Sequence, residues 1–292
     1  MIIFVVHQGS LRYLKYCLRQ LRVVCRTEKI LWLGASKEIK IPGVVSLSLN
    51  SYSTAAKEFG THYRHRSSNS VAFELFCFQR WFYIAEAAKQ MGFVDEPILC
   101  LDSDALLYRV PSFGPSSEVD LATCRRTGPQ YTWFKNLNVL EQFCRFMANS
   151  FTDPGHGLEL DQFFVTKDSP LADHGGNVCD MHLLGLFSLT LGVAYRDLES
   201  RGDDSGIFYD DNLNVVGEFE SERGSEGPKR VVWKNGLPHG VRNHVLIPFG
   251  GLHFQGGLKK RMSEFMSRPT PDELFVTWLK ILSRGFRRKR KR

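Results

Sequence analysis

Short apolar runs alternate with amphipathic segments along the first part of the chain. Residues 2–7 and 30–33 are almost entirely apolar, which predicts strands that are buried on both faces. Between them, residues 11–24 repeat apolar side chains at helical spacing and predict a helix, so the chain opens with a β-α-β unit. A third short strand is predicted over residues 44–49.

A long helix is predicted over residues 71–91, after a polar stretch at 60–70. Its apolar face carries Leu75, Phe78, Phe82, Ala85 and Ala88. Gly92 follows as a helix stop, and the wholly apolar residues 98–101 predict another buried strand. Strands that alternate with helices in this way predict an α/β fold of the Rossmann-like type, with a mainly parallel mixed sheet and helices on both faces.

The second half of the chain has a less regular pattern. We predict a strand at 119–124, a helix at 136–149, a loop at 153–157 before another apolar run at 158–165, and a short helix at 180–191. Residues 200–229 are rich in Gly, Ser and acids, which predicts a loop or a lid. Residues 231–233 and 241–248 are predicted to pair as a hairpin arm that turns through Asn235-Gly236.

The last residues differ in character from the rest. Residues 270–273 (Thr-Pro-Asp-Glu) form a capping box with proline at the first helical position. The apolar stripe that follows contains Leu274, Phe275, Trp278, Leu279 and Leu282. We therefore divide the chain into a domain at 1–268 and an amphipathic helix with a polybasic tail at 269–292, which suits an anionic membrane surface. The alternative is that the stripe packs on the body and the tail is disordered.

The net charge of +7 belongs to this tail, because residues 284–292 hold seven cations and no acid. The rest has 31 basic and 31 acidic residues, which argues against a nucleic-acid partner. No apolar run reaches the length of a transmembrane helix, and the N-terminus lacks the basic region of a signal peptide. The seven cysteines form no CxxC pair and predict reduced thiols. We expect a cytoplasmic protein, peripheral on the inner membrane face.

Two carboxylates, Asp102 and Asp104, follow the buried strand at 98–101 with only Ser103 between them. Ligands bind at the C-terminal ends of strands in an open α/β sheet. Two like charges so close together are costly unless a cation neutralises them, and Mg²⁺ or Mn²⁺ does this while also holding a phosphate. The motif therefore suggests a metal–diphosphate site, and the alternative is a solvated turn after a strand.

A second motif lies near the end of the first domain, where His253 is followed by Gly256 and Lys259. Imidazole can complete a Mn²⁺ shell that carboxylates begin, glycine lets the backbone approach a phosphate, and lysine stabilises a departing diphosphate. The alternative is a strand that ends in a Gly-Gly turn with a surface histidine.

In this pair of motifs the chain resembles the glycogenin-like and lipopolysaccharide-galactosyltransferase-like glycosyltransferases of the GT-A fold. They carry Asp-x-Asp after a buried strand and His-x-x-Gly-x-x-Lys near the end of the catalytic domain. The resemblance implies that Asp104 and His253 bind Mn²⁺ (or Mg²⁺) and that Asp102 contacts the metal or the ribose, with Ser103 also at the nucleotide. It implies that Gly256 and Lys259 hold the diphosphate of a nucleotide sugar, most simply a UDP-sugar. It also implies a retaining transfer of a hexose. A membrane-surface location would suit a glycan or lipid-linked acceptor, as in polysaccharide biosynthesis.

Three further assignments follow from the resemblance. The family has an Asp-Gln near the sugar, for which Asp161-Gln162 is the matching pair. Arg80 matches a basic residue that contacts nucleotide or phosphate, with a surface ion pair to Glu74 or Glu86 as the alternative. His7, at the end of the first strand, occupies the place where this fold meets the nucleotide base.

The sequence also departs from the family pattern. Lys260-Arg261 stands after Lys259, where Pro-Trp often follows, and residues 208–214 resemble a motif of bacterial surface-polysaccharide glycosyltransferases to which we assign no role. Two other functions stay open. One is a haloacid-dehalogenase-type phosphatase that uses Asp102 as nucleophile, although its motif normally ends the first strand. The other is a non-catalytic, membrane-associated polysaccharide-binding protein.

Overall fold

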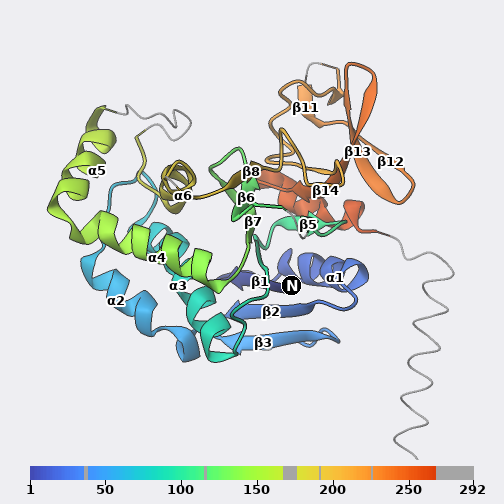
Figure 1. Cartoon of the computed structure of the whole chain (residues 1–292). Helices are drawn as coiled ribbons and strands as arrows, with labels where there is room; N and C mark the ends of the chain where they lie inside the picture. Colours follow the sequence, from blue (N-terminus) through green and yellow to red (C-terminus); the bar gives the residue numbers. More distant parts are fainter. Residues whose placement is uncertain (36–38, 115–116, 167–175, 191, 225, 268–292) are drawn as a thin grey trace, which may run out of the picture.

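The computed structural model describes residues 1–35, 39–114, 117–166, 176–190, 192–224 and 226–267. Its centre is a mixed sheet in the strand order β3-β2-β1-β4-β7-β6-β8 (Figure 1). Of these seven strands, β7 alone runs against the others. The strands are β1 (Ile2–His7), β2 (Lys29–Gly34), β3 (Val44–Ser48), β4 (Ile98–Leu101), β6 (Leu121–Cys124), β7 (Gly128–Phe134) and β8 (Tyr195–Asp197).

Alternate side chains of β1 enter two hydrophobic cores, one on each face of the sheet. Phe4 packs in one core with the helices that gather on the left of Figure 1, and Ile3 packs in the other. The first group of helices is α2 (Thr54–His62), α3 (Val71–Gln90), α4 (Leu137–Thr152), α5 (Pro154–Thr166) and α6 (Asp180–Ser188), with the short 3-10 helix η1 (Leu49–Tyr52) beside them. On the other face, α1 (Leu14–Val24) shares the core with a second sheet. The predicted α/β fold with a mainly parallel mixed sheet is confirmed.

Local capping explains where several helices begin. The Ser70 hydroxyl accepts a hydrogen bond from Phe73 N (3.4 Å) at the start of α3, and Asn136 caps α4 in the same way through Val139 N (3.2 Å). The loop predicted at 153–157 is wrong, because α5 begins at Pro154. Proline suits the first turn of a helix, and Asp153 Oδ1 accepts a hydrogen bond from Gly155 N at 2.7 Å.

The second sheet has the strand order β12-β13-β14-β5, and β9 pairs with β14 beside it. Asn235 and Gly236 both have positive φ, so the predicted turn through them is confirmed. The predicted pairing of residues 231–233 with 241–248 is wrong. The two-residue turn pairs Lys234 with Leu237, so β12 pairs with β13, and residues 245–248 belong to the next strand, β14. The strands here are β5 (Ala105–Leu107), β9 (Phe208–Tyr209), β12 (Val231–Lys234), β13 (Leu237–Arg242) and β14 (Val245–His253).

The remaining segments complete the description. Residues 200–229 contain β9 and a small pair of strands, β10 (Ser221–Arg223) and β11 (Glu226–Lys229), within extended loops. The 3-10 helix η3 (Gly256–Phe265) follows β14. The helix predicted from residue 270 and the basic tail lie outside the described residues, so the division at 268/269 stays a prediction. Within the described part, every helix is too short or too polar to cross a bilayer.

Candidate metal and nucleotide-sugar site

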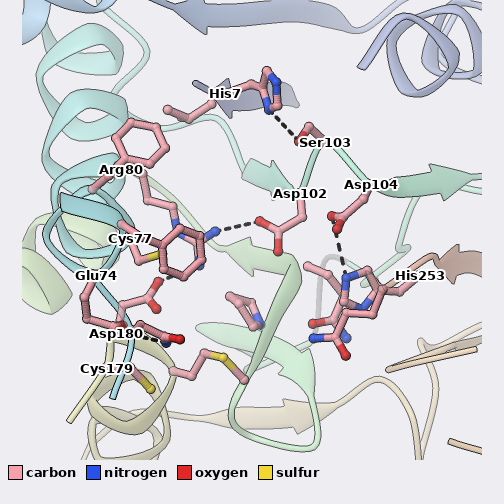
Figure 2. A pocket seen from close by; sticks show the side chains of 18 of the residues that line it. His7, Glu74, Cys77, Arg80, Asp102, Ser103, Asp104, Cys179, Asp180 and His253 are labelled. Atoms are coloured by element: carbon pink, nitrogen blue, oxygen red, sulfur yellow. Dashed lines mark hydrogen bonds and ion pairs between the residues drawn. The ribbon is translucent and has the colours of Figure 1, made fainter. Parts of the chain in front are cut away.

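A cleft of about 1070 Å³ opens at the C-terminal ends of β1 and β4. Figure 2 shows its two walls, with side chains from the end of β1, from the residues after β4 and from the end of β14 on one side, and side chains from α3 and the start of α6 on the other. This is the edge where an open α/β sheet binds its ligands. Most residues of the two sequence motifs line this cleft: Asp102, Ser103, Asp104, His253 and Lys259.

The side chains of Asp102, Asp104 and His253 converge on one point of the cleft. One ligand atom from each lies within 4.8 Å of the others. The register of the second sheet produces this meeting, because β14 pairs His253 with Ala105, the residue that follows Asp104. Two carboxylates and an imidazole are donors that suit Mn²⁺, so these residues fit the expected metal.

Two cations neutralise Asp104 within the protein itself. Lys259 Nζ lies 2.8 Å from Oδ2, and His253 Nε2 lies 3.6 Å from Oδ1. Burial alone would raise the pKa of Asp104, but the hydrogen bonds and charges of His253 and Lys259 hold this pKa well below its usual value. Burial would likewise lower the pKa of His253, and Asp104 raises it instead to about 9.

Arg80 joins the two walls of the cleft. Its guanidinium contacts Asp102 Oδ1 at 2.6 Å and Asp180 Oδ2 at 2.5 Å (Figure 2). Asp180 is 2% exposed and also accepts a hydrogen bond from Trp81 Nε1 at 2.9 Å. Arg80 therefore forms neither of the ion pairs, with Glu74 or Glu86, that were the alternative to a functional role.

His7 has a defined tautomer. Its Nε2 lies 3.0 Å from the carbonyl oxygen of Ser10, which can only accept, so Nε2 carries the proton. Nδ1 then accepts from the Ser103 hydroxyl at 2.9 Å, and burial lowers the pKa of the ring. Both nitrogens are thus engaged within the protein, and the ring lines the cleft mainly as a surface.

The second motif turns sharply after its histidine. Gly256 has φ of +59°, in the left-handed region that favours glycine, and it opens the 3-10 helix that returns Lys259 to Asp104. Gln255 and Lys259 line the cleft. Gly256 lies between them without lining it, and nothing stands within 4 Å of where its Cβ would be.

Asp161 and Gln162 lie elsewhere. Both are exposed on α5, neither lines the cleft, and Asp161 pairs with Arg66. Of the apolar residues around this pair, Leu160 and Phe163 are buried on the packing face of α5, whereas Leu158 and Phe164 are exposed. The structure therefore gives these two residues no contact with the other candidates.

Sequence reasoning did not find Asp180, Glu74 and Asp211, which line the same cleft. Glu74 is 1% exposed and accepts hydrogen bonds from Ser67 and Asn69, both at 2.8 Å. The available signal for Asp180 is an acid at the start of a short apolar helix, which is also an ordinary helix N-terminus. That pattern does not distinguish a cleft residue from a surface one.

No protein-family model matches the chain, and the comparison with curated proteins finds no relative. Several solved structures are similar in shape. The galactosyltransferase LgtC in complex with donor and acceptor sugar analogues is 12% identical, covers 93% of this chain and 98% of its own, and has a TM-score of 0.46.

Two other solved structures are similar over less of the chain. Mouse xyloside xylosyltransferase 1 is 8% identical over 68% of this chain and 86% of its own, with a TM-score of 0.41. The glycosyltransferase GlyE of Streptococcus pneumoniae TIGR4 is 13% identical over 68% of this chain and 45% of its own, with a TM-score of 0.34. At these identities and TM-scores the similarity concerns the fold alone.

Proposed function

We propose that this protein is a metal-dependent glycosyltransferase of the GT-A type, which transfers a hexose from a nucleotide sugar, most simply a UDP-sugar. One observation carries the proposal: Asp102, Asp104, His253 and Lys259 converge at one end of a single cleft. A volume of about 1070 Å³ lies at the upper end of the range for ligand pockets and accommodates a nucleoside diphosphate with its sugar.

The residues divide the work by their chemistry. Asp102, Asp104 and His253 would hold Mn²⁺ or Mg²⁺, which when bound offsets the negative charge of the diphosphate leaving group. Lys259 offers a second positive charge to the same diphosphate, and the turn at Gly256 aims it there. His7 and Ser103 form the floor beside the base and ribose.

The sugar belongs on the α3–α6 side of the cleft. We propose Asp180 in place of Asp161 and Gln162 as the acid beside it, because Asp180 lines the cleft and those two do not. Arg80 fixes the Asp180 carboxylate and the metal-side Asp102 in one arrangement. A retaining outcome rests on the family resemblance alone, and the anomeric configuration of the product would decide it.

The acceptor is proposed to be a glycan or a lipid-linked saccharide. The seven cations of residues 284–292 support a peripheral location on an anionic membrane, at about 1 kcal/mol for each basic residue near such a surface. Sedimentation with vesicles of phosphatidylglycerol and phosphatidylcholine tests this location. Binding by the full chain should disappear in a chain that lacks residues 270–292, and equal binding by both would refute a role for the tail.

Isothermal titration with UDP, with and without Mn²⁺, tests the proposed function. Wild type should bind UDP with Mn²⁺ and much more weakly without it, and Asp104→Asn should lose the metal-dependent part. Asp95→Asn, an exposed acid outside the cleft, serves as the matched control and should behave as wild type. Failure to bind UDP with any divalent metal would refute the UDP-sugar assignment and direct the next assays to other nucleotides and to phosphatase activity.

A further inference from the structure

The segment at residues 210–214, which sequence analysis left without a role, lies directly against His253. We propose that the buried ion pair between Asp210 and Lys229 positions His253 for metal binding. This inference rests on the proposed metal site and deepens it. Neither residue lines the cleft, so both would act as positioning residues through His253 and not by contact with a ligand.

The backbone of this segment runs alongside the end of β14. Asp210 N donates to Gly251 O at 3.1 Å, and Leu213 N donates to His253 O at 3.0 Å. The Asp210 carboxylate adds a third bond, because its Oδ2 accepts from the backbone N–H of His253 at 3.2 Å. The backbone of His253 is thus fixed on both its N–H and its carbonyl side by residues 210–213.

The same segment also fixes the imidazole ring. His253 Nδ1 lies 2.5 Å from the carbonyl oxygen of Asp211, and since a carbonyl only accepts, Nδ1 carries a proton. Nε2 is therefore the nitrogen that faces Asp104 and would ligate the metal. Gln130 Nε2 donates to the same carbonyl at 3.1 Å and to the Asp211 carboxylate at 2.9 Å, which holds that peptide in place.

Lys229 anchors the segment from the opposite side. Its Nζ lies 2.6 Å from Asp210 Oδ1, and its backbone N–H donates to Leu213 O at 2.9 Å. The two side chains are 3% and 0% exposed, so two charges have been removed from water completely. A buried ion pair of this kind adds little net stability compared with apolar side chains of similar size. Its geometry is directional, however, and it fixes the orientation of the carboxylate that holds His253.

The pair thus has a specific mechanical consequence. With its Oδ1 held by Lys229, the Asp210 carboxylate presents Oδ2 to the His253 N–H, and residue 211 follows with its carbonyl toward the ring. Without the pair, the 210–213 segment keeps its backbone bonds, but the Asp210 side chain loses the partner that aims its Oδ2 at the His253 N–H. His253 Nε2 would then sample positions away from Asp104.

The test compares metal binding in wild type and in Asp210→Asn/Lys229→Met, which removes both charges of the pair. Glu199, whose carboxylate lies 3.9 Å from Lys229 Nζ, keeps Arg125 as a partner at 3.4 Å. Titration with Mn²⁺ alone should give a dissociation constant about 10- to 100-fold higher in the double variant, as is typical when a partner of a metal-ligating histidine is lost. Glu220→Gln/Arg230→Met is the matched control. It neutralises an exposed pair 2.8 Å apart, next to Lys229 in sequence, and should stay within about twofold of wild type.

A second readout does not depend on metal. In metal-free wild type, the Nδ1 proton of His253 should give a slowly exchanging downfield NMR signal, which the double variant should lose. If Asp210→Asn/Lys229→Met does not fold, Asp210→Asn/Lys229→Leu, which also leaves residue 229 without a donor, replaces it. A folded double variant with wild-type Mn²⁺ affinity and an unchanged signal would overturn the inference. If wild type binds no Mn²⁺, the metal site itself is refuted, and the imidazole signal alone decides the positioning role.

Discussion

In the proposed function, Lys259 has two competing partners, Asp104 and the diphosphate. Substitution of Lys259 should therefore have opposite effects on the binding of metal and of nucleotide. In the protein without ligands its ammonium contacts Asp104 at 2.8 Å, where it occupies a carboxylate oxygen that a metal would use. In the proposed function the same ammonium binds the diphosphate. We therefore expect Lys259→Met to strengthen Mn²⁺ binding in the absence of nucleotide and to weaken UDP binding in the presence of Mn²⁺.

The magnitudes follow from the contact. Two unit charges at 2.8 Å attract by roughly 6 kcal/mol at an effective dielectric of about 20. Lys259 is 33% exposed, so water screens the pair and the net value falls to about 1–2 kcal/mol. Its removal should lower the Mn²⁺ dissociation constant by about tenfold. Loss of one charge-assisted hydrogen bond to the diphosphate should raise the UDP dissociation constant by about 10- to 100-fold.

Isothermal titration of Mn²⁺ alone, and then of UDP at saturating Mn²⁺, measures both effects on the same protein. Lys260→Met is the matched control, because this neighbouring lysine is exposed and does not line the cleft. It should leave both constants within about twofold of wild type. If Lys259→Met weakened Mn²⁺ binding as well, Lys259 would support the metal site and not compete for it, and the exchange reasoning would be refuted.

Three further predictions concern the charged groups around the cleft. Asp104 raises the pKa of His253 to about 9, and a metal binds only the unprotonated Nε2. The affinity for Mn²⁺ should therefore rise roughly tenfold per pH unit from pH 7 to 9. An affinity that does not change with pH in this range would contradict this. Arg80→Met should lower the free energy of unfolding by about 3–5 kcal/mol in urea denaturation, because it leaves the buried Asp180 carboxylate without its cation. Adding Asp180→Asn should restore most of this loss, and a double variant no more stable than Arg80→Met would refute the pairing. Burial and Asp211 raise the folded-state pKa of Glu199 to about 7, so ionisation costs stability as pH rises from the ordinary value through 7. Glu199→Gln should be more stable than wild type by roughly 3 kcal/mol at pH 8, with the gain fading toward pH 4.5, and equal stability at pH 8 would contradict it.

The middle of the central sheet was accessible from the sequence because its strands are buried on both faces. Residues 2–7 and 98–101 are apolar at nearly every position, and the structure places β1 and β4 side by side in the middle of the sheet. β5 and β7 were missed for different reasons. The three residues of β5 are too few to show a period. β7 is fully buried but begins Gly-Pro-Gln and has Thr between its aromatic residues, so it shows neither an apolar run nor an alternation.

The candidate site was only partly accessible from the sequence. Asp102, Asp104, His253 and Lys259 could be proposed because each motif is short and its chemistry depends on residue type at fixed spacing. That they meet depends on the pairing of β5 with β14, some 150 residues apart in the chain, which no local pattern encodes. Asp161 illustrates the reverse case, since its apolar neighbours have the same pattern in a surface helix as in a strand end beside a pocket.

The cations in and beside the cleft differ in how deeply they are buried, and this suggests that some keep their carboxylate partners while others can change partner. Three of these cations differ in the exposure of their side chains: Lys229 is 3% exposed, Arg80 14% and Lys259 33%. A fully buried cation cannot leave its partner without exposing an unpaired charge to a low-dielectric interior, whereas a cation at the solvent edge exchanges partners at small cost. Lys229 and Arg80 are therefore suited to hold His253 and Asp102 in place before any ligand arrives. In the proposed function, the Lys259 ammonium, on the open side of Asp104, would leave that carboxylate and bind the incoming diphosphate.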